Sequence, residues 1–437
     1  MKVVVIGAGV VGLCSALALR REGAEVIVLD RTLDAHGASA GNAGWVVPML
    51  SAPLSGPGVL GDVVRATLRG EGSVAARPAA GLLSWTAGFL RSSGRRRHQA
   101  GLRAVLDLAA GSVERFGELR ASGVEFEMHR RGLLLAARTE HGMDEVLALV
   151  DGARRAGYDG CTQVHTGAGA RRLEPALSDS VHGAVHAPVE AHVRPESVLA
   201  GLRAALVAEG AELRGGVDVR GAERDGAGRW RVATSTGPVP ADRVVIAAGV
   251  PSATLLRDLG VRVPLLAGKG YSVTACGTGT VPVHAVKLLE ANLACSPFDG
   301  GLRLSGMFEL GGRGEGVRSR ALRRIQAGAA RYLRDWRPAE TGLRIGGLRP
   351  STPDSLPVIG AVPGRDGVFA ATGHGTLGLT LAPATAAALA PLVLHGVLAP
   401  ELAPFALGRF GQRATAAAVS AGPISRTSDV APTPRAR

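Results

Sequence analysis

Three glycines and an aspartate near the N-terminus have the residue types and the spacing needed to bind a dinucleotide. Gly7, Gly9 and Gly12 form a G-x-G-x-x-G motif, and Asp30 ends the second apolar run of the chain. In such a motif the first glycine allows a tight turn, the second lets the backbone approach a pyrophosphate, and the third lets a helix pack closely on a sheet. A carboxylate at the position of Asp30 accepts hydrogen bonds from ribose hydroxyls.

The residues around this motif predict a βαβ unit. Residues 2–6 and 25–29 are short β-branched runs, and the stretch between them has helical apolar spacing. Val10 and Val11 open the helix, where free N–H groups meet phosphates, and Arg31 follows the acid. A chance glycine turn is the alternative in a chain with 62 glycines, but strand, glycines, helix, strand and acid in this order favour a dinucleotide site. These residues serve NAD and FAD equally.

A second stretch of small residues follows the second predicted strand. Small side chains there let the backbone pass close to a cofactor, whereas an ordinary glycine-rich connection is the alternative. From this stretch we assign to the cofactor site Ser39, Gly41, Asn42, Ala43 and Gly44.

Later segments add further predicted cofactor contacts. The apolar run at 244–249 is typical of a central parallel strand and ends in the small residues Ala248 and Gly249, and Val219 ends a strand predicted at 211–219. A strand at 368–371 runs into a glycine loop and a long helix, which offers a second helix N-terminus to an electron-rich group. This loop contributes Gly373, His374, Gly375, Thr376, Leu377 and Gly378.

The formal net charge of +13 invites a nucleic-acid interpretation, but the arrangement of the charges argues against it. Lysine occurs only at positions 2, 269 and 287, the arginines are scattered outside residues 91–98, and aromatic residues (3%) are too few for a stacking surface. We therefore predict no nucleic-acid partner and leave open a peripheral contact with anionic membrane.

The four cysteines have no metal-ligand spacing, so we predict no metal site. Few cysteines fit a reducing cytoplasm, with the inner face of the membrane as the alternative location. The apolar stretch at 377–397 contains two prolines and is predicted as a buried helix rather than a membrane span.

The order of these patterns predicts an α/β fold in which a Rossmann-like dinucleotide-binding domain carries an inserted α+β substrate domain, built on an antiparallel or mixed sheet. Helical patterns at about 81–93, 100–122 and 141–157 are mixed with strand candidates. The cofactor domain is expected to be discontinuous and to comprise residues 1–55, 185–265 and 345–410. The substrate domain is expected to comprise residues 56–184 and 266–344, and residues 411–437 to form a disordered tail.

Together these segments resemble the FAD-dependent amine and amino-acid oxidoreductases that include D-amino-acid oxidase, glycine oxidase and sarcosine oxidase, and they look most like the bacterial D-amino-acid dehydrogenases. The matching pieces run in family order from residue 1 to about 395: the glycine motif with Asp30, SAGNAG (39–44), GKGYSVT (268–274), GLRPSTPDSLPVIG (347–360) and TGHGTLG (372–378). The resemblance implies that the dinucleotide is FAD. It also implies non-covalent binding, because no cysteine lies near the Thr-Pro-Asp of residues 352–354.

The resemblance further implies roles for single residues. Arg349 would hold the substrate carboxylate beside the cofactor, because a guanidinium fixes a planar carboxylate through two parallel hydrogen bonds. The alternative is an internal ion pair, for example with Asp354. Tyr271 would face the pocket, with a core aromatic as the alternative, and His374 would lie at the flavin.

The implied reaction is hydride transfer from the amine-bearing carbon of a small D-configured or cyclic amino acid to flavin N5. Glu190, His192 and His374 are candidates for handling a proton, although such residues are more often structural. A glycine- or sarcosine-type oxidase, or an amine oxidase acting on a larger metabolite, is the alternative. The electron acceptor, a quinone, the respiratory chain or O2, stays open. The chain departs from the family at Ile345-Gly346, where dehydrogenases of this type carry Trp-Thr or Trp-Ala.

Overall fold

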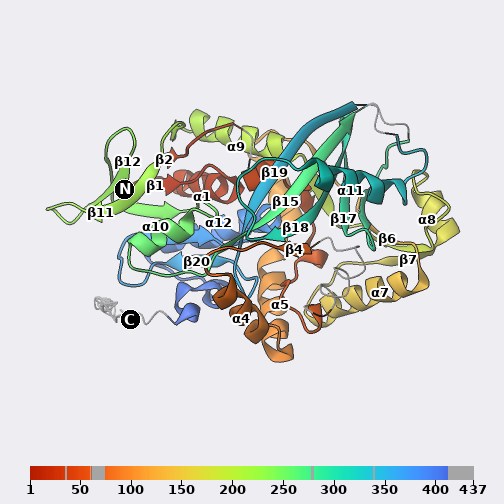
Figure 1. Ribbon diagram of the computed structural model, residues 1–437. Helices are drawn as coiled ribbons and strands as arrows, with labels where there is room; N and C mark the ends of the chain where they lie inside the picture. Colours follow the sequence, from red (N-terminus) through yellow and green to blue (C-terminus); the bar gives the residue numbers. More distant parts are fainter. Residues whose placement is uncertain (35–36, 60, 62–73, 277–279, 338–339, 412–437) are drawn as a thin grey trace, which may run out of the picture.

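The computed structural model describes residues 1–34, 37–59, 61, 74–276, 280–337 and 340–411. Two large sheets dominate this part of the chain, a parallel-rich sheet near the N-terminus and a larger mixed sheet beside it (Figure 1). The predicted disordered tail at 411–437 lies, apart from Gly411, outside the described residues.

The first sheet has six strands in the order β10-β2-β1-β14-β21-β20. All neighbouring strands are parallel except β20 and β21. β1 and β2 are almost wholly apolar because both faces of the sheet are covered, as is usual for parallel strands. The bounds are β1 (Lys2–Ile6), β2 (Glu25–Leu29), β10 (Glu212–Arg214), β14 (Arg243–Ile246), β20 (Val358–Ala361) and β21 (Val368–Thr372).

Helices cover one face of this sheet, and a smaller sheet covers the other. The first face shares a core with α1 (Val10–Arg21), α9 (Pro195–Ala208) and α12 (Gly378–His395). The second face packs on α10 (Ser252–Asp258) and on β11 (Val219–Arg224), β12 (Trp230–Thr234) and β13 (Val239–Ala241). In the described part of the chain α12 alone is long and apolar enough to cross a membrane, and 72% of its apolar window is buried inside the protein. This burial matches the core helix predicted there.

The second sheet has nine strands, eight in the order β19-β15-β18-β17-β16-β6-β8-β7 and one, β4, paired with β18. Most pairs are antiparallel, but β6 with β16 and β4 with β18 are parallel. The α/β class with a second, mixed sheet is therefore confirmed. The bounds are β4 (Val74–Ala76), β6 (Leu133–Ala137), β7 (Gln163–Thr166), β8 (Gly183–Ala187), β15 (Leu266–Cys276), β16 (Ala285–Leu288), β17 (Leu293–Phe298), β18 (Gly301–Leu310) and β19 (Glu340–Ser351).

The two faces of the nine-stranded sheet have different neighbours. Helices α8 (Gly167–Leu173) and α11 (Ser319–Ala330) cover one face and share a core with Val273 and Leu304 (Figure 1). Because side chains alternate along a strand, Gly270 and Ser272 point to the opposite face. We call this opposite face the inner face.

The inner face meets the loop that follows β2. That loop contains α2 (Gly37–Ala40), and Arg303 on β18 donates to the carbonyl oxygens of Ala40 at 3.0 Å and Asn42 at 3.2 Å. Arg303 is 2% exposed and also pairs with Glu196 at the start of α9. This buried arginine therefore ties the mixed sheet to the parallel-rich sheet and its helices.

Shorter elements complete the described chain. A small three-stranded sheet has the order β3-β9-β5. Its strands are β3 (Trp45–Val46), β5 (Met128–His129) and β9 (Ala191–Val193). The remaining helices are η1 (Pro48–Leu50), α4 (Leu82–Ser92), α5 (Arg95–Ala109), α6 (Ser112–Ala121), α7 (Glu140–Arg155), η2 (Pro400–Phe405) and η3 (Leu407–Phe410).

Two predicted elements differ in the structure. The helix expected at 100–122 is two helices, α5 and α6, because the chain turns at Gly111 with a φ of 69°. The strand expected at 211–219 is divided between β10 and the start of β11. In addition, β19 crosses the domain boundary that is expected at residue 345. The division into two domains stays a prediction.

Candidate functional site

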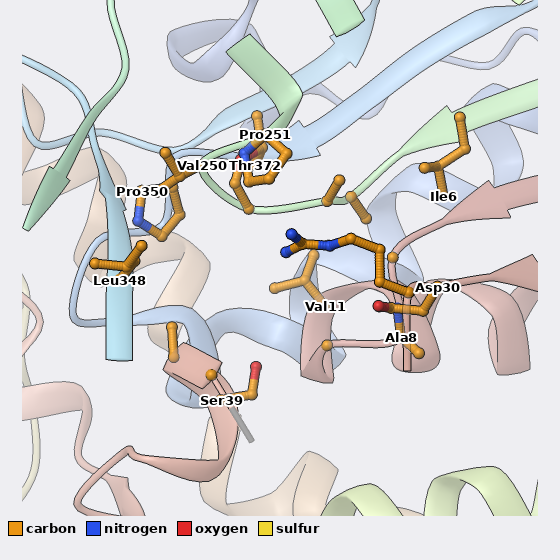
Figure 2. A pocket seen from close by; sticks show the side chains of 18 of the residues that line it. Ile6, Ala8, Val11, Asp30, Ser39, Val250, Pro251, Leu348, Pro350 and Thr372 are labelled. Carbon is orange, nitrogen blue, oxygen red and sulfur yellow. The ribbon is translucent and has the colours of Figure 1, made fainter. Parts of the chain in front are cut away.

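A cavity of about 890 Å³ is lined by the carboxyl ends of β1, β2 and β21 and by β19. Ligands in sheets of this kind bind outside the carboxyl ends of the strands. Figure 2 shows Asp30 and Ala8 on one side of the cavity and Leu348 and Pro350 on the other. The predicted cofactor residues that line it are Gly7, Gly9, Val10, Val11, Asp30, Arg31, Ser39, Asn42, Val219, Ala248, Gly249, His374, Gly375 and Gly378.

The glycine turn makes the close backbone contacts that the motif predicts. Gly7 has a φ of 115°, and a Cβ there would lie 2.5 Å from the carbonyl oxygen of Ala247. A Cβ on Gly12 would lie 1.9 Å from the carbonyl oxygen of Gly7. Gly12 does not line the cavity, so its role is to let α1 pack against the turn.

Asp30 is held at the tip of β2 by backbone donors. Its Oδ2 accepts from the N–H of Ala8 at 2.5 Å, and its Oδ1 accepts from the N–H of Thr32 at 3.3 Å. Each carboxylate oxygen can accept a further hydrogen bond, so the group keeps capacity for ribose hydroxyls.

Ser39 and Asn42 bring polar atoms of the second loop to the cavity. The hydroxyl of Ser39 accepts from the N–H of Val10 at 3.1 Å, at the start of α1. The side-chain carbonyl of Asn42 accepts from the N–H of Gly44 at 2.8 Å and so fixes the end of the loop. The loop is therefore ordered by its own side chains next to the glycine turn.

Gly41, Ala43 and Gly44 do not line the cavity. A Cβ on Gly41 would lie 2.8 Å from Cγ2 of Ile345, and one on Gly44 would lie 2.1 Å from the carbonyl oxygen of Val193. These two glycines make room for neighbouring strands of the protein. Packing between elements therefore explains why glycine stands at these two positions, and their contact with the cofactor stays a prediction.

The loop before α12 brings His374, Gly375 and Gly378 to the cavity, whereas Gly373, Thr376 and Leu377 do not line it. His374 is 4% exposed, and its Nε2 lies 3.0 Å from the hydroxyl of Thr385. Burial lowers the pKa of His374 to about 3, so the imidazole is neutral at physiological pH. Positive potential at this end of the cavity therefore comes from the N-terminus of α12.

Arg349 extends from β19 across the inner face and lies over Gly270. A Cβ on Gly270 would lie 2.2 Å from Nη2 of Arg349, and Nη1 donates to the carbonyl oxygen of Met307 at 3.2 Å. Its neighbours in the strand, Leu348 and Pro350, line the cavity, although Arg349 itself does not. The guanidinium thus lies on the inner face, beside the cavity.

Among the described residues, no carboxylate forms an ion pair with Arg349. Asp354, the alternative partner expected from the sequence, is paired with Arg409, whose Nε lies 2.8 Å from Oδ2. Burial lowers the pKa of Arg349 to about 10, which still leaves a cation at neutral pH. A half-buried cation of this kind is well suited to an anionic ligand.

The structure corrects the predicted orientation of Tyr271. The side chain is 1% exposed and belongs to the core under α11, together with Val273. Successive side chains of a strand point to opposite faces of the sheet, so Tyr271 faces away from the inner face on which Gly270 lies. Burial, with a contribution from the charge of Glu309, raises the pKa of Tyr271 to about 12, so it is a neutral core phenol.

Glu190 and His192 also lie outside the cavity lining. His192 has its Nε2 2.8 Å from the carbonyl oxygen of Pro297, and burial lowers its pKa to about 4. Oε1 of Glu190 accepts from the hydroxyl of Tyr158 at 2.8 Å and from the N–H of Met49 at 3.2 Å. Burial raises the pKa of Glu190 to about 7. Both side chains hydrogen-bond to groups of the protein, which is what the structural alternative predicts.

Sequence reasoning missed Gly270, Arg303 and Lys287. The alternation of small residues with large ones along β15 was a signal for the inner face and could have identified Gly270. Arg303 and Lys287 carry no local signal, because their partners come from distant segments.

This arrangement fits an extended dinucleotide. Asp30 is placed for a ribose, the N-terminus of α1 for the pyrophosphate, and the N-terminus of α12 for an electron-rich ring at the far end. Arg349 places a cation next to that end, since its neighbour Pro350 accepts a hydrogen bond from the N–H of Gly375.

The comparisons with known proteins agree with this geometry. A family model described as "FAD dependent oxidoreductase" matches residues 2–392. D-amino acid dehydrogenase of Paramagnetospirillum magneticum is 33% identical over 405 residues, which cover 90% of this chain and 95% of the relative. D-amino acid dehydrogenase 2 of Ralstonia nicotianae is 32% identical over 432 residues, which cover 94% and 100%.

A solved structure of glycine oxidase from Geobacillus kaustophilus has a TM-score of 0.72 and 25% sequence identity, with coverage of 93% of this chain and 99% of that chain. The match of the family model over most of the chain names the cofactor as FAD. This chain therefore belongs to the FAD-dependent oxidoreductase family that the model describes.

Proposed function

We propose that this protein oxidises a small amino acid, D-configured or cyclic, with FAD held non-covalently. The observation that carries the proposal is Arg349, a cation on the inner face that has no acidic partner among the described residues and lies beside the cavity. The names of the relatives, D-amino acid dehydrogenase and glycine oxidase, support an amino acid as the ligand of this cation.

The residues that would hold FAD come from both ends of the chain. Asp30 would bind the ribose, the start of α1 the pyrophosphate, and the start of α12 the isoalloxazine ring. Burial raises the pKa of the Cys14 and Cys295 thiols, so neither offers a thiolate for a covalent link, and the exposed Cys161 and the partly exposed Cys276 do not line the cavity. When bound, FAD accepts a hydride from the amine-bearing carbon of the substrate.

The protein's part in this reaction is orientation. Arg349 would bind the carboxylate through its guanidinium and so fix the α-carbon relative to the cavity. Loss of the hydride turns the amine into an imine, which water hydrolyses to a keto acid and ammonia. If the amine enters uncharged, no protein base is needed, which agrees with a neutral His374 and a core Tyr271.

A glycine-type oxidase is the second candidate, because the glycine oxidase structure covers nearly the whole chain. The two candidates share the amine oxidation and differ in what reoxidises the flavin. Release of peroxide in air identifies an oxidase, whereas reduction of a quinone or dye without peroxide identifies a dehydrogenase.

Steady-state assays with enantiomer pairs test the proposal. The purified protein should reduce a dye with D-amino acids, D-proline or glycine, and the L-enantiomers should be poor substrates. Arg349→Leu should lower kcat/KM by roughly 100-fold or more while bound flavin is retained, since the charged hydrogen bonds to the carboxylate are lost. Equal activity of the variant, or turnover of amines that lack a carboxylate, would refute the role of Arg349.

A further inference from the structure

A row of cross-strand neighbours leads from the FAD-binding loop to Lys287 on the inner face. Residues paired directly across a sheet point to the same face. The row begins at Ile345, whose Cγ2 lies 2.8 Å from where a Cβ of Gly41 would be. It continues through Ser272, Ser305, Ala294 and Lys287 to Leu135. Lys287 therefore shares the inner face with Arg349.

The two cations reach toward the same strand. Nη1 of Arg349 lies at the carbonyl oxygen of Met307 on β18, while Nζ of Lys287 donates to the side-chain oxygen of Asn292. The backbone oxygen of Asn292 lies 3.5 Å from where a Cβ of Gly306 would be, one residue before Met307. β16 is two strand spacings, about 10 Å, from β18, a separation that a small molecule with two anionic groups can span.

No acid of the described chain neutralises this pair. Neither cation forms an ion pair there, and the nearest acid in the sequence, Glu290, accepts hydrogen bonds from Arg138, Thr139 and Tyr332 instead. Burial, with a further contribution from the positive charge of Arg349, lowers the pKa of Lys287 to about 8, so the two like charges lie in one region. Such a pair is costly without an anion, so a ligand that brings negative charge is favoured.

Buried hydroxyls on the same face also lack partners. Ser305 stands in the row itself, and Ser296 lies two residues after Ala294 on β17. Both side chains are buried, and neither hydroxyl has a hydrogen-bond partner among the described residues. Buried polar groups are normally satisfied, so these hydroxyls indicate a place where a polar ligand completes the hydrogen bonding.

We propose that Lys287 binds a second carboxylate, on the side chain or the nitrogen substituent of the substrate, while Arg349 binds the first. The preferred substrate is then a dicarboxylic amino acid, with D-aspartate and D-glutamate as the simplest probes. This inference rests on the proposed amino-acid oxidation and adds the chemical class of the substrate.

Isosteric substrate pairs test the charge alone. D-Glutamate and D-glutamine, or D-aspartate and D-asparagine, have the same shape, so the ratio of their kcat/KM values measures recognition of the second carboxylate. We expect the acid of at least one pair to be preferred by roughly 10- to 100-fold, the range of a charge-assisted hydrogen bond. Equal or better turnover of the amides would overturn the role of Lys287 and leave the proposed oxidation intact.

Variants of Lys287 test whether this residue causes the preference for the acid over the amide. Lys287→Met should remove most of the acid-to-amide ratio, and Lys287→Arg should keep it because the charge is kept. Lys2→Met is the control. It removes the same charge from β1, which belongs to the parallel-rich sheet and not to the nine-stranded sheet, and it should leave the ratio unchanged. A ratio that survives in Lys287→Met contradicts the proposal.

Ligand binding gives a readout that needs no turnover and no variant. Glutarate and valerate have the same chain length, and both lack an oxidisable amine. Glutarate should perturb the flavin absorption spectrum of the wild-type protein at roughly tenfold lower concentration than valerate. Equal affinity would argue against a second carboxylate site. If no amino acid of either class reduces the flavin, the proposed oxidation fails, and the substrate class fails with it.

Discussion

Gly270 and Arg349 occupy one space on the inner face of the mixed sheet. The guanidinium lies where a side chain at position 270 would begin, with Nη2 only 2.2 Å from the Cβ that an alanine would add. β15 and β19 are adjacent and antiparallel, and Arg349 pairs with Gly268, so its side chain extends two residues along β15 to lie over Gly270. The glycine in this strand therefore sets the position of the proposed carboxylate-binding group.

Gly270→Ala should weaken substrate binding without loss of flavin. The methyl group must displace the guanidinium, which should raise KM and lower kcat/KM by roughly tenfold or more. The measurement is a steady-state assay together with the ratio of flavin to protein. Gly226→Ala is a matched control, because a Cβ there meets nothing within 4 Å. Unchanged KM in Gly270→Ala would show that Arg349 is free to move or does not bind substrate.

Asp30→Ala should weaken FAD binding. The variant loses the acceptor at the tip of β2 and the hydrogen bond to the N–H of Ala8, so we expect a rise in the dissociation constant of FAD by roughly tenfold or more. Fluorescence titration of the apoprotein with FAD measures this constant. Asp107→Ala, an exposed acid on α5, should bind FAD like the wild type. Equal affinity of Asp30→Ala would place the ribose elsewhere.

Glu190 should make the fold less stable as the pH rises. Its pKa is raised by burial from 4.5 in the unfolded chain to about 7 in the folded protein. Between these values the folded protein holds the proton and the unfolded chain releases it, so stability falls through this window by about 3 kcal/mol in total. Glu190→Gln keeps an acceptor for Tyr158 and Met49 and cannot ionise, so it should lack this loss.

Urea unfolding at about pH 5 and about pH 8 measures this difference in the free energy of unfolding. Glu118→Gln, an exposed acid on α6, is the control and should follow the wild type. If wild type and Glu190→Gln lose the same stability between the two pH values, the carboxyl of Glu190 is ionised throughout.

Local patterns predicted the parts of the site that are local in the chain. Gly7, Gly12 and Asp30 belong to one βαβ unit whose contacts span few residues, and the sequence was sufficient to place them. Gly41 and Gly44 also stood out, but the strands that they accommodate come from residues 345 and 193, which no local pattern reveals.

The substrate side of the site depended on strand pairing. Gly346 and Gly347 lie inside β19, where α2 packs against the strand and a Cβ on Gly347 would lie 2.8 Å from Cα of Ala38. The family resemblance implied that Tyr271 faces the pocket, but the alternation of side chains along β15 places it in the core. Four successive strand pairings, from β19 to β16, determine that Lys287 lies on the inner face, and the sequence alone does not show these pairings.

Anaerobic reduction of the bound flavin tests the central claim most directly. The yellow protein, mixed without oxygen with D-glutamate, D-aspartate, D-alanine, D-proline or glycine, should lose its flavin absorbance with at least one of them. The bleaching should yield one keto acid or cyclic imine for each flavin reduced, and Arg349→Leu, tested with that same substrate, should bleach far more slowly. A protein that binds FAD and stays yellow with every member of this panel would contradict the account.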